Sequence, residues 1–73
     1  MNLVILIKVV PTRADAVLEK FLKIDGVRKA YFSYGRFDIV VFAEAPDYKS
    51  IRAVSGRINS IDGVRSSETL PEA

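Results

Sequence analysis

The 73-residue sequence contains no cysteine and no histidine. Without cysteine, the chain forms no disulfide bond and offers no thiolate to a metal. Without histidine, it has neither an imidazole ligand nor an imidazole general base. These absences exclude a Cys-x-x-Cys heavy-metal carrier and any enzyme that depends on a histidine base. We expect neither a bound metal nor a cofactor.

Catalytic signatures are scarce as well. A catalyst without cysteine and histidine depends on Asp, Glu, Lys, Tyr or Ser side chains. The sequence shows no spaced pair of carboxylates, no pairing of a nucleophile with a base, and no glycine-rich phosphate loop. We therefore predict that the protein is not an enzyme. A small dimeric α/β-barrel enzyme stays open as an alternative, because some such enzymes share the fold predicted below.

The chain also has little excess charge and no long apolar run. Eleven Lys and Arg face nine Asp and Glu, and the net charge of +2 is too small to indicate nucleic-acid binding. The first apolar run ends at Lys8, and no positive segment precedes it as in a signal peptide. No run approaches the roughly 20 residues of a membrane helix. We expect a cytoplasmic protein that binds neither a membrane nor nucleic acid directly.

The small size of the chain points to oligomerisation. A domain of this length buries only roughly 60% of its unfolded surface. Small domains often add disulfides, a metal or oligomerisation to reach stability. The first two are excluded here, and 49% of the residues are hydrophobic. We therefore expect apolar surface in excess of what one copy can bury.

One pentapeptide occurs twice. Ile-Asp-Gly-Val-Arg fills residues 24–28 and again residues 61–65, an offset of 37 residues, which is half of the chain. Self-similarity at a fixed period indicates one supersecondary unit used twice. The unit here reads as strand, helix, strand, with the pentapeptide at each passage from helix to final strand. The sequence thus predicts an α+β, ferredoxin-like β-α-β-β-α-β fold with a four-stranded antiparallel sheet.

The expected elements follow from apolar periodicity and turn residues. Thr12 and Asp47 are the predicted N-caps of two helices, and Gly26 and Gly63 are their predicted C-terminal stops. Within the second helix Gly56 costs roughly 1 kcal/mol relative to alanine, and close helix packing would explain it. Strands are expected at residues 3–10, 27–34, 37–45 and 64–70, with a hairpin turn at Gly35-Arg36 and a frayed tail at 71–73.

Apolar residues lie on both faces of the predicted central strands. Leu3, Ile5, Ile7 and Val9 share one face of the first strand, whereas Val4, Leu6 and Val10 share the other. Right-handed crossovers place both helices on the same sheet face, so helices cover only one set. The other set is an exposed apolar patch of the kind that marks an interaction surface. We therefore predict a homodimer formed by the open sheet faces.

Several ordered motifs resemble those of a known family. They are LIKV in the first strand, a proline, a helix ending in I-x-G-V, an aromatic strand, Gly-Arg-Phe-Asp at 35–38 followed by IVV, a second I-x-G-V, and Ser-Ser-Glu-Thr at 66–69. The set is similar to the effector-binding module, often called RAM, of the leucine-responsive regulatory protein (Lrp)/AsnC transcription regulators. The resemblance covers nearly the whole chain. It implies a single RAM-like domain over residues 1–73, like the stand-alone members that carry no DNA-binding domain.

The resemblance also implies partners and a site. Members of the family assemble homodimers into rings, so octamers or decamers are expected, and full-length Lrp/AsnC-type regulators are candidate partners. Small amino acids bind between dimers near the Gly-x-x-Asp hairpin, and the module modulates transcription or amino-acid metabolism. The family often has threonine where Tyr34 stands. Matched by position, the candidate ligand-binding residues are Ser33, Tyr34, Gly35, Arg36, Phe37, Asp38, Ser66, Ser67 and Thr69.

These residue types suit an amino acid. Asp38 can pair with the ammonium group, and Arg36 or backbone N–H groups at Gly35 can bind the carboxylate. The hydroxyl side chains can add neutral hydrogen bonds, and Tyr34 or Phe37 can wall the side-chain pocket. Structural roles remain open for each: a hairpin glycine, a carboxylate bonding backbone N–H groups, a solvated arginine, and aromatic residues in the core or the dimer interface.

RNA binding is the second alternative. The ferredoxin-like fold includes the RNA-recognition motif, whose third strand carries a basic-Gly-aromatic signature. Residues 34–42 resemble that signature only weakly. However, Asp38 would repel phosphate, and aliphatic residues occupy most of the open face.

Overall fold

The computed structural model describes residues 1–71, and the chain order is strand, helix, strand, strand, helix, strand, as predicted. A short 3-10 turn, η1, precedes the first helix. The elements are β1 (Asn2–Val9), η1 (Pro11–Arg13), α1 (Ala14–Phe21), β2 (Val27–Phe32), β3 (Ile39–Glu44), α2 (Tyr48–Ser60) and β4 (Val64–Pro71).

The four strands form one antiparallel sheet in the order β2-β3-β1-β4. β1 is a central strand, paired with β3 on one side and β4 on the other, as predicted from the apolar residues on both of its faces. This order and the element sequence confirm the ferredoxin-like fold.

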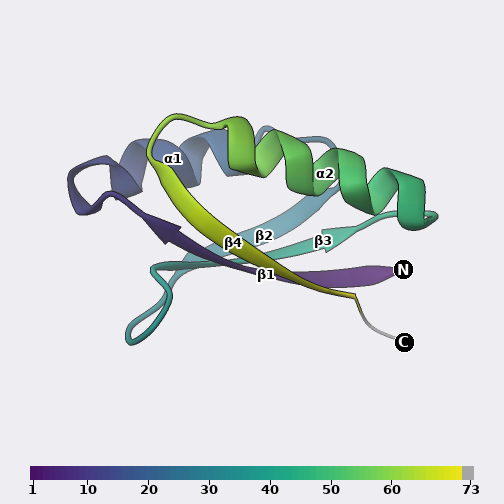
Figure 1. The fold of residues 1–73 in the computed structure, drawn as a ribbon, viewed down its shortest axis with the longest axis horizontal. Coiled ribbons are helices and arrows are strands. Elements are labelled where there is room, and N and C mark those ends of the chain that lie inside the picture. The colour runs from purple at the N-terminus through teal and green to yellow at the C-terminus, as the bar shows by residue number, and fades with distance from the viewer. Residues whose placement is uncertain (72–73) are drawn as a thin grey trace.

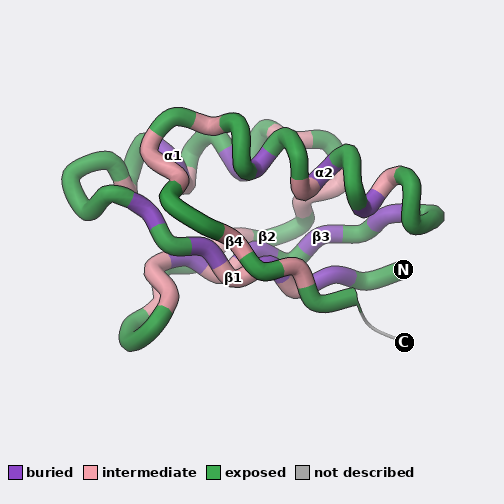
Figure 2. The backbone as a smooth tube through the Cα atoms, in the orientation of Figure 1, coloured by how far each residue is buried: buried purple, intermediate pink, exposed green. Residues whose placement is uncertain are grey.

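Both helices cover the same face of the sheet (Figure 1). The core lies between the two layers, and Figure 2 shows the buried positions alternating along β1 and β3 and facing the sheet on the helices. Leu3, Ile5 and Ile7 of β1 are at most 1% exposed. Alternation along β1 therefore places the odd-numbered residues against the helices and leaves Val4 and Leu6 on the opposite face.

The two helices begin differently. Asp47 caps α2 as predicted, with its carboxylate accepting a hydrogen bond of 2.8 Å from the Ser50 N–H. That bond lowers the pKa of Asp47 from its ordinary 3.8. The predicted cap at Thr12 is wrong, because Thr12 lies inside η1 and the N-cap residue of α1 is Arg13, whose side chain makes no capping hydrogen bond in the part of the chain that the structure describes. Pro11, with its fixed φ, starts the turn earlier, and Arg13 N–H donates to the Val10 carbonyl at 2.8 Å.

The glycines of the two pentapeptides lie in the turns directly before β2 and β4. The helices end earlier than predicted, because α1 ends at Phe21, five residues before Gly26, and α2 ends at Ser60, three residues before Gly63. Gly26 and Gly63 have φ of +95° and +104°, which side chains disfavour. Space is also limiting at Gly63, where a Cβ atom would lie 2.9 Å from Cγ2 of Val17. Close packing does not explain Gly56, because a Cβ atom there would meet no atom of another segment within 4 Å among the described residues.

The connection between β2 and β3 is longer than predicted. The strands end at Phe32 and begin again at Ile39, so residues 33–38 replace the expected two-residue turn at Gly35-Arg36. A hydrogen bond of 2.8 Å from Ser33 N–H to the Asp38 carbonyl closes this loop, which projects from one end of the sheet (Figure 1). At the C-terminus, Pro71 belongs to β4 rather than to a frayed tail, and residues 72–73 of the predicted tail lie outside the described residues.

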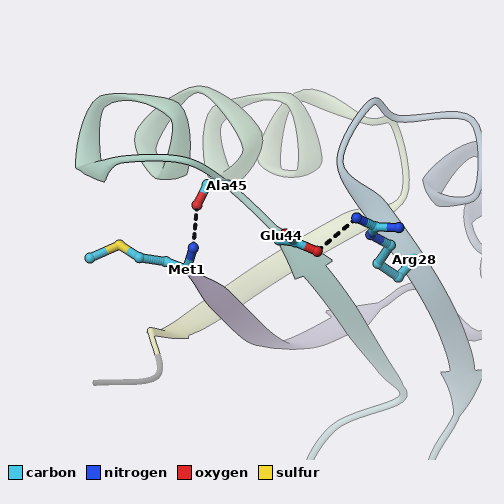
Figure 3. Close-up of polar contacts among 4 residues, drawn as sticks. All are labelled: Met1, Arg28, Glu44 and Ala45. Carbon is cyan, nitrogen blue, oxygen red and sulfur yellow. Dashed lines mark hydrogen bonds and ion pairs between the residues drawn. The ribbon is translucent and has the colours of Figure 1, made fainter.

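Polar contacts join distant segments at the other end of the sheet. The Met1 ammonium donates to the Ala45 carbonyl at 2.6 Å, and Arg28 pairs with Glu44 at 2.7 Å (Figure 3). These contacts fasten the start of β1 to the end of β3, and the end of β3 to β2. Within residues 1–71, no helix has the length and apolar character needed to cross a membrane.

Candidate functional site

A cavity of about 440 Å³ lies at the end of the sheet from which the β2–β3 loop projects. It opens where β1 passes into η1 and the start of α1, beside the end of β2. The lining residues are Val9, Pro11, Ala14, Asp15, Phe32, Ser33, Tyr34 and Asp38. Three of the predicted site residues, Ser33, Tyr34 and Asp38, are thus brought to one cavity.

Asp38 is fixed by three hydrogen bonds. Its N–H donates to the Ile7 carbonyl at 2.9 Å, its carbonyl accepts from Ser33 N–H at 2.8 Å, and carboxylate Oδ2 accepts from Val9 N–H at 2.9 Å. The bonded groups belong to β1 as well as to the loop. Oδ1 makes no hydrogen bond within residues 1–71. A ligand cation can therefore approach a carboxylate that the backbone already holds in place.

Two aromatic side chains border the cavity and are open to solvent. Phe32, at the end of β2, is 47% exposed, and Tyr34 in the loop is 98% exposed. Both line the cavity, together with Val9 and Pro11. A ligand or a second protein surface that covers this end of the sheet would remove these rings from water.

The centre of the loop does not line the cavity. Gly35 has φ of +106° and open space where a Cβ atom would lie, so it serves the turn as expected of a loop glycine. Arg36 is exposed and forms no ion pair within residues 1–71. Phe37 is half-buried. Arg36 is therefore a cation in the projecting loop that does not line the cavity.

The three candidate residues of β4 lie away from the cavity. Ser67 donates a hydrogen bond to Asn59 Oδ1 at 2.8 Å, and the Thr69 hydroxyl lies 2.8 Å from that of Ser55. Both partners belong to α2, so Ser67 and Thr69 face the helices and tie β4 to α2. Ser66 is exposed and stands opposite Lys8 on the other face of the sheet. Within one copy, the candidate residues of β4 therefore do not line the same cavity as the candidate residues of the loop.

The cavity is acidic. Among residues 1–71, two carboxylates line it, those of Asp15 and Asp38, and no arginine or lysine does. Asp15, in the first turn of α1, is not among the candidate residues taken from the sequence. Its place in the cavity depends on how α1 packs against the end of the sheet, and no local motif signals it. The acidic lining favours an ammonium group over a carboxylate at this position.

Two further depressions merge at the opposite end of the sheet. Their volumes are about 400 and 340 Å³, and both are lined by Asp25, Gly26, Glu44, Ala45 and Pro46. Arg28 borders the first and already pairs with Glu44. No candidate residue from the sequence lies there. Within residues 1–71, no three acidic side chains gather closely enough to hold a metal ion.

The sheet face opposite the helices carries the apolar patch predicted from β1. We call it the open face. Strand pairing sets Val4 opposite Phe42 and Leu70, and the rings of Tyr31 and Phe42 meet edge to face with centroids 6.2 Å apart. Tyr31, Phe42 and Leu70 are 52%, 40% and 46% exposed. The apolar members of the open face are Val4, Leu6, Tyr31, Val40, Phe42 and Leu70, and its charged members include Lys8, Lys29 and Glu68.

Comparison with known proteins agrees with this architecture. TTHA0845 from Thermus thermophilus superposes with a TM-score of 0.90 at 27% identity, over 94% of this chain and 88% of that chain. Escherichia coli AsnC gives a TM-score of 0.88 at 25% identity, over 94% of this chain and 48% of that chain. The hypothetical protein PHS023 from Pyrococcus horikoshii shares the fold, with a TM-score of 0.85 at 24% identity over 94% and 84% of the two chains. No curated protein sequence matches the chain.

The model of one protein family matches the sequence over residues 2–71, nearly its full length. That family is described as the Lrp/AsnC ligand binding domain. The match spans every strand and helix, the β2–β3 loop and the acidic cavity beside it. The chain therefore belongs to the Lrp/AsnC ligand-binding domain family.

Proposed function

We propose that this protein is an amino-acid effector-binding and oligomerisation module that modulates transcription or amino-acid metabolism in the cytoplasm. It acts without catalysis and without contacting DNA itself, through assembly with copies of itself and with full-length Lrp/AsnC-type regulators. The observation that carries the proposal is the acidic cavity, bordered by Phe32 and Tyr34, beside the Gly-x-x-Asp loop in a domain of this family.

The cavity supports recognition of the ammonium group. Asp38 is held by Val9 N–H and keeps Oδ1 for a ligand, and Asp15 adds a second negative charge to the lining. Phe32 and Tyr34 provide apolar surface for the side chain of a bound amino acid. A charge-assisted hydrogen bond to Asp38 would fix the orientation of the ligand.

Recognition of the carboxylate requires groups beyond the lining of the cavity. Arg36 is the cationic residue nearest to Asp38 in the sequence, and the loop also offers backbone N–H groups around Gly35. The loop projects from the molecule, so a neighbouring copy can also approach this end. The site would then be completed when dimers associate into an octamer or a decamer, with Ser66, Ser67 and Thr69 of another copy as candidates for the remaining contacts.

The open face supports a homodimer. It exposes two aromatic rings and Leu70 beside the half-buried Val4, Leu6 and Val40. Packing two such faces together would give each copy the apolar burial that a domain of this size lacks.

Calorimetric titration with each of the twenty amino acids tests the ligand. We expect heat from one or a few small amino acids, and loss of binding by at least about tenfold in Asp38→Asn, a free-energy change of about 1.4 kcal/mol. Asp25→Asn, at the opposite end of the sheet, is the matched control and should bind normally. If no amino acid gives heat or a thermal shift with the wild-type protein, the effector half of the proposal is wrong.

RNA binding is the alternative with an observation in its favour. Tyr31 and Phe42 are exposed on the open face near Lys8 and Lys29, as stacking residues would be. A dimer through this face would cover both rings. Filter binding of single-stranded RNA at low salt distinguishes RNA binding from dimerisation by this face. RNA that the wild-type protein retains on the filter and Phe42→Ala does not would favour the RNA-binding hypothesis.

A further inference from the structure

The charges of the open face are separated across the sheet. Lys29 stands on the outer strand β2, opposite Phe42, and Glu68 stands on the other outer strand β4, opposite Leu6. Three strand spacings separate these outer strands, about 14 Å. Each copy therefore carries a cation at one edge of its apolar patch and an anion at the other.

Neither Lys29 nor Glu68 forms an ion pair within residues 1–71. The ion pairs within residues 1–71 are Arg13–Asp62 and Arg28–Glu44. Glu44 is thus already engaged by Arg28 and does not compete for Lys29. Lys8 stands diagonally from Glu68 on the adjacent strand and forms no ion pair with it. Lys29 and Glu68 are both exposed.

We propose that a second copy of this chain supplies the missing partners, with Lys29 of each copy pairing with Glu68 of the other across the edges of the dimer. The inference rests on the proposed dimer through the open faces and specifies its orientation. The two pairs are symmetric, so one dimer contains both.

Charge complementarity selects this orientation. A two-fold axis between two stacked sheets can run along the strands or across them. An axis along the strands places β2 of one copy over β4 of the other, so Lys29 meets the edge that holds Glu68 and Leu70. An axis across the strands places β2 over β2 and β4 over β4, which brings like charges together.

The distance along the strands is also compatible. Lys29 is level with Phe42, Val4 and Leu70, and Glu68 is two residues from Leu70 on the same face. Two residues span about 7 Å along a strand, which the long side chains of lysine and glutamate can bridge. The apolar residues between the two edges would be buried, with the ion pairs at the rim.

Charge reversal tests the pairing. Lys29→Glu and Glu68→Lys should each raise the dimer dissociation constant by about tenfold, a free-energy change of about 1.4 kcal/mol. The double variant Lys29→Glu/Glu68→Lys should return to within about twofold of wild type, because it restores both pairs with their signs exchanged. Lys49→Glu and Glu19→Lys, on the helical layer, are the matched controls and should leave dimerisation unchanged. Analytical ultracentrifugation measures all six proteins.

A carbodiimide cross-link gives an independent measurement. This reagent joins a lysine to a carboxylate only when the two are in contact. Lys29 and Glu68 of one chain lie at opposite edges of the sheet, so a Lys29–Glu68 cross-link must join two chains. Mass spectrometry of the cross-linked dimer band should identify this peptide pair.

The outcomes separate this inference from the proposed function. If the wild-type protein is monomeric at micromolar concentration, the proposed dimer is wrong, and the proposed Lys29–Glu68 ion pairs are wrong as well. If the wild type is dimeric but the single reversals match it, the dimer stands and the Lys29–Glu68 pairing is overturned. Reversals that weaken the dimer without rescue by the double variant also overturn the pairing.

Discussion

The carboxylate of Asp38 accepts a hydrogen bond of 2.9 Å from the backbone N–H of Val9, 29 residues earlier in the chain. Val9 is the last residue of β1, and Asp38 lies immediately before β3. The side chain thus supplies an acceptor to β1 at the point where the β3 backbone turns away into the loop. One carboxylate therefore sets the end of the strand pairing and lines the acidic cavity.

The Val9–Asp38 bond makes a prediction about stability. Asp38→Ala leaves the buried Val9 N–H without an acceptor and should lower the free energy of unfolding by about 1–2 kcal/mol. Asp38→Asn retains an oxygen acceptor and should stay close to wild type. Urea unfolding followed by circular dichroism measures both. Equal stability of Asp38→Ala and wild type would show that water or another group replaces the bond.

Two glycines should respond oppositely to alanine. Gly63→Ala places a side chain at φ of +104° and 2.9 Å from Cγ2 of Val17, so it should destabilise the fold by roughly 1–3 kcal/mol. Gly56→Ala adds a helix-favouring residue in open space on α2 and should stabilise by roughly 0.5–1 kcal/mol. Thermal unfolding of the two variants provides the comparison, and a stabilising Gly63→Ala would contradict the observed backbone conformation.

The cap at Asp47 predicts an acid dependence. Hydrogen bonding to Ser50 lowers the pKa of Asp47 in the folded state below its ordinary 3.8. The carboxylate thus contributes stability above about pH 4, and this contribution is lost as pH falls through the folded pKa. Asp47→Ala should have a lower melting temperature than wild type at pH 7, and the difference should narrow below about pH 4. A difference that stays constant from neutral to strongly acidic pH would argue against the ionised cap.

If the open face forms the dimer, a charge placed in it should weaken the dimer. Phe42→Glu places a charge at the centre of the proposed dimer interface and should raise the dimer dissociation constant by at least about tenfold, a change of about 1.4 kcal/mol. The helical circular dichroism should not change, because Phe42 faces away from the helices. Leu22→Glu, at an exposed position in the helical layer, is the control. If Phe42→Glu remains as dimeric as wild type, the interface lies elsewhere.

Local signals in the sequence were sufficient for the order of the elements. The repeated pentapeptide marks the passage from each helix to the strand that follows it, and its glycines at 26 and 63 have positive φ in the turns there. Asp47 caps its helix because the Ser50 N–H that it bonds lies only three residues away. Each of these features depends on neighbours in the sequence, so the pattern alone predicts it.

The candidate site was only partly predictable for the opposite reason. The resemblance indicated the loop at residues 33–38, and three of its residues line the cavity. The roles of Asp15 and Phe32 in that cavity depend on α1 packing beside the end of β2. Likewise, Ser67 and Thr69 face α2 because of the register of β4 against β1. In that register, alternate residues of β4 lie on the sheet face that the helices cover.

The sequence alone thus determined the ferredoxin-like order of strands and helices, the two glycine turns before β2 and β4, and the presence of apolar residues on both faces of β1. The tertiary structure decided which face the helices cover, where β2 and β3 end, and which side chains enclose the acidic cavity. The difference has a physical basis. Turns, caps and periodicity arise from interactions between residues a few positions apart, whereas strand ends and cavities arise from contacts such as Asp38 with Val9, which exist only after distant segments pack together.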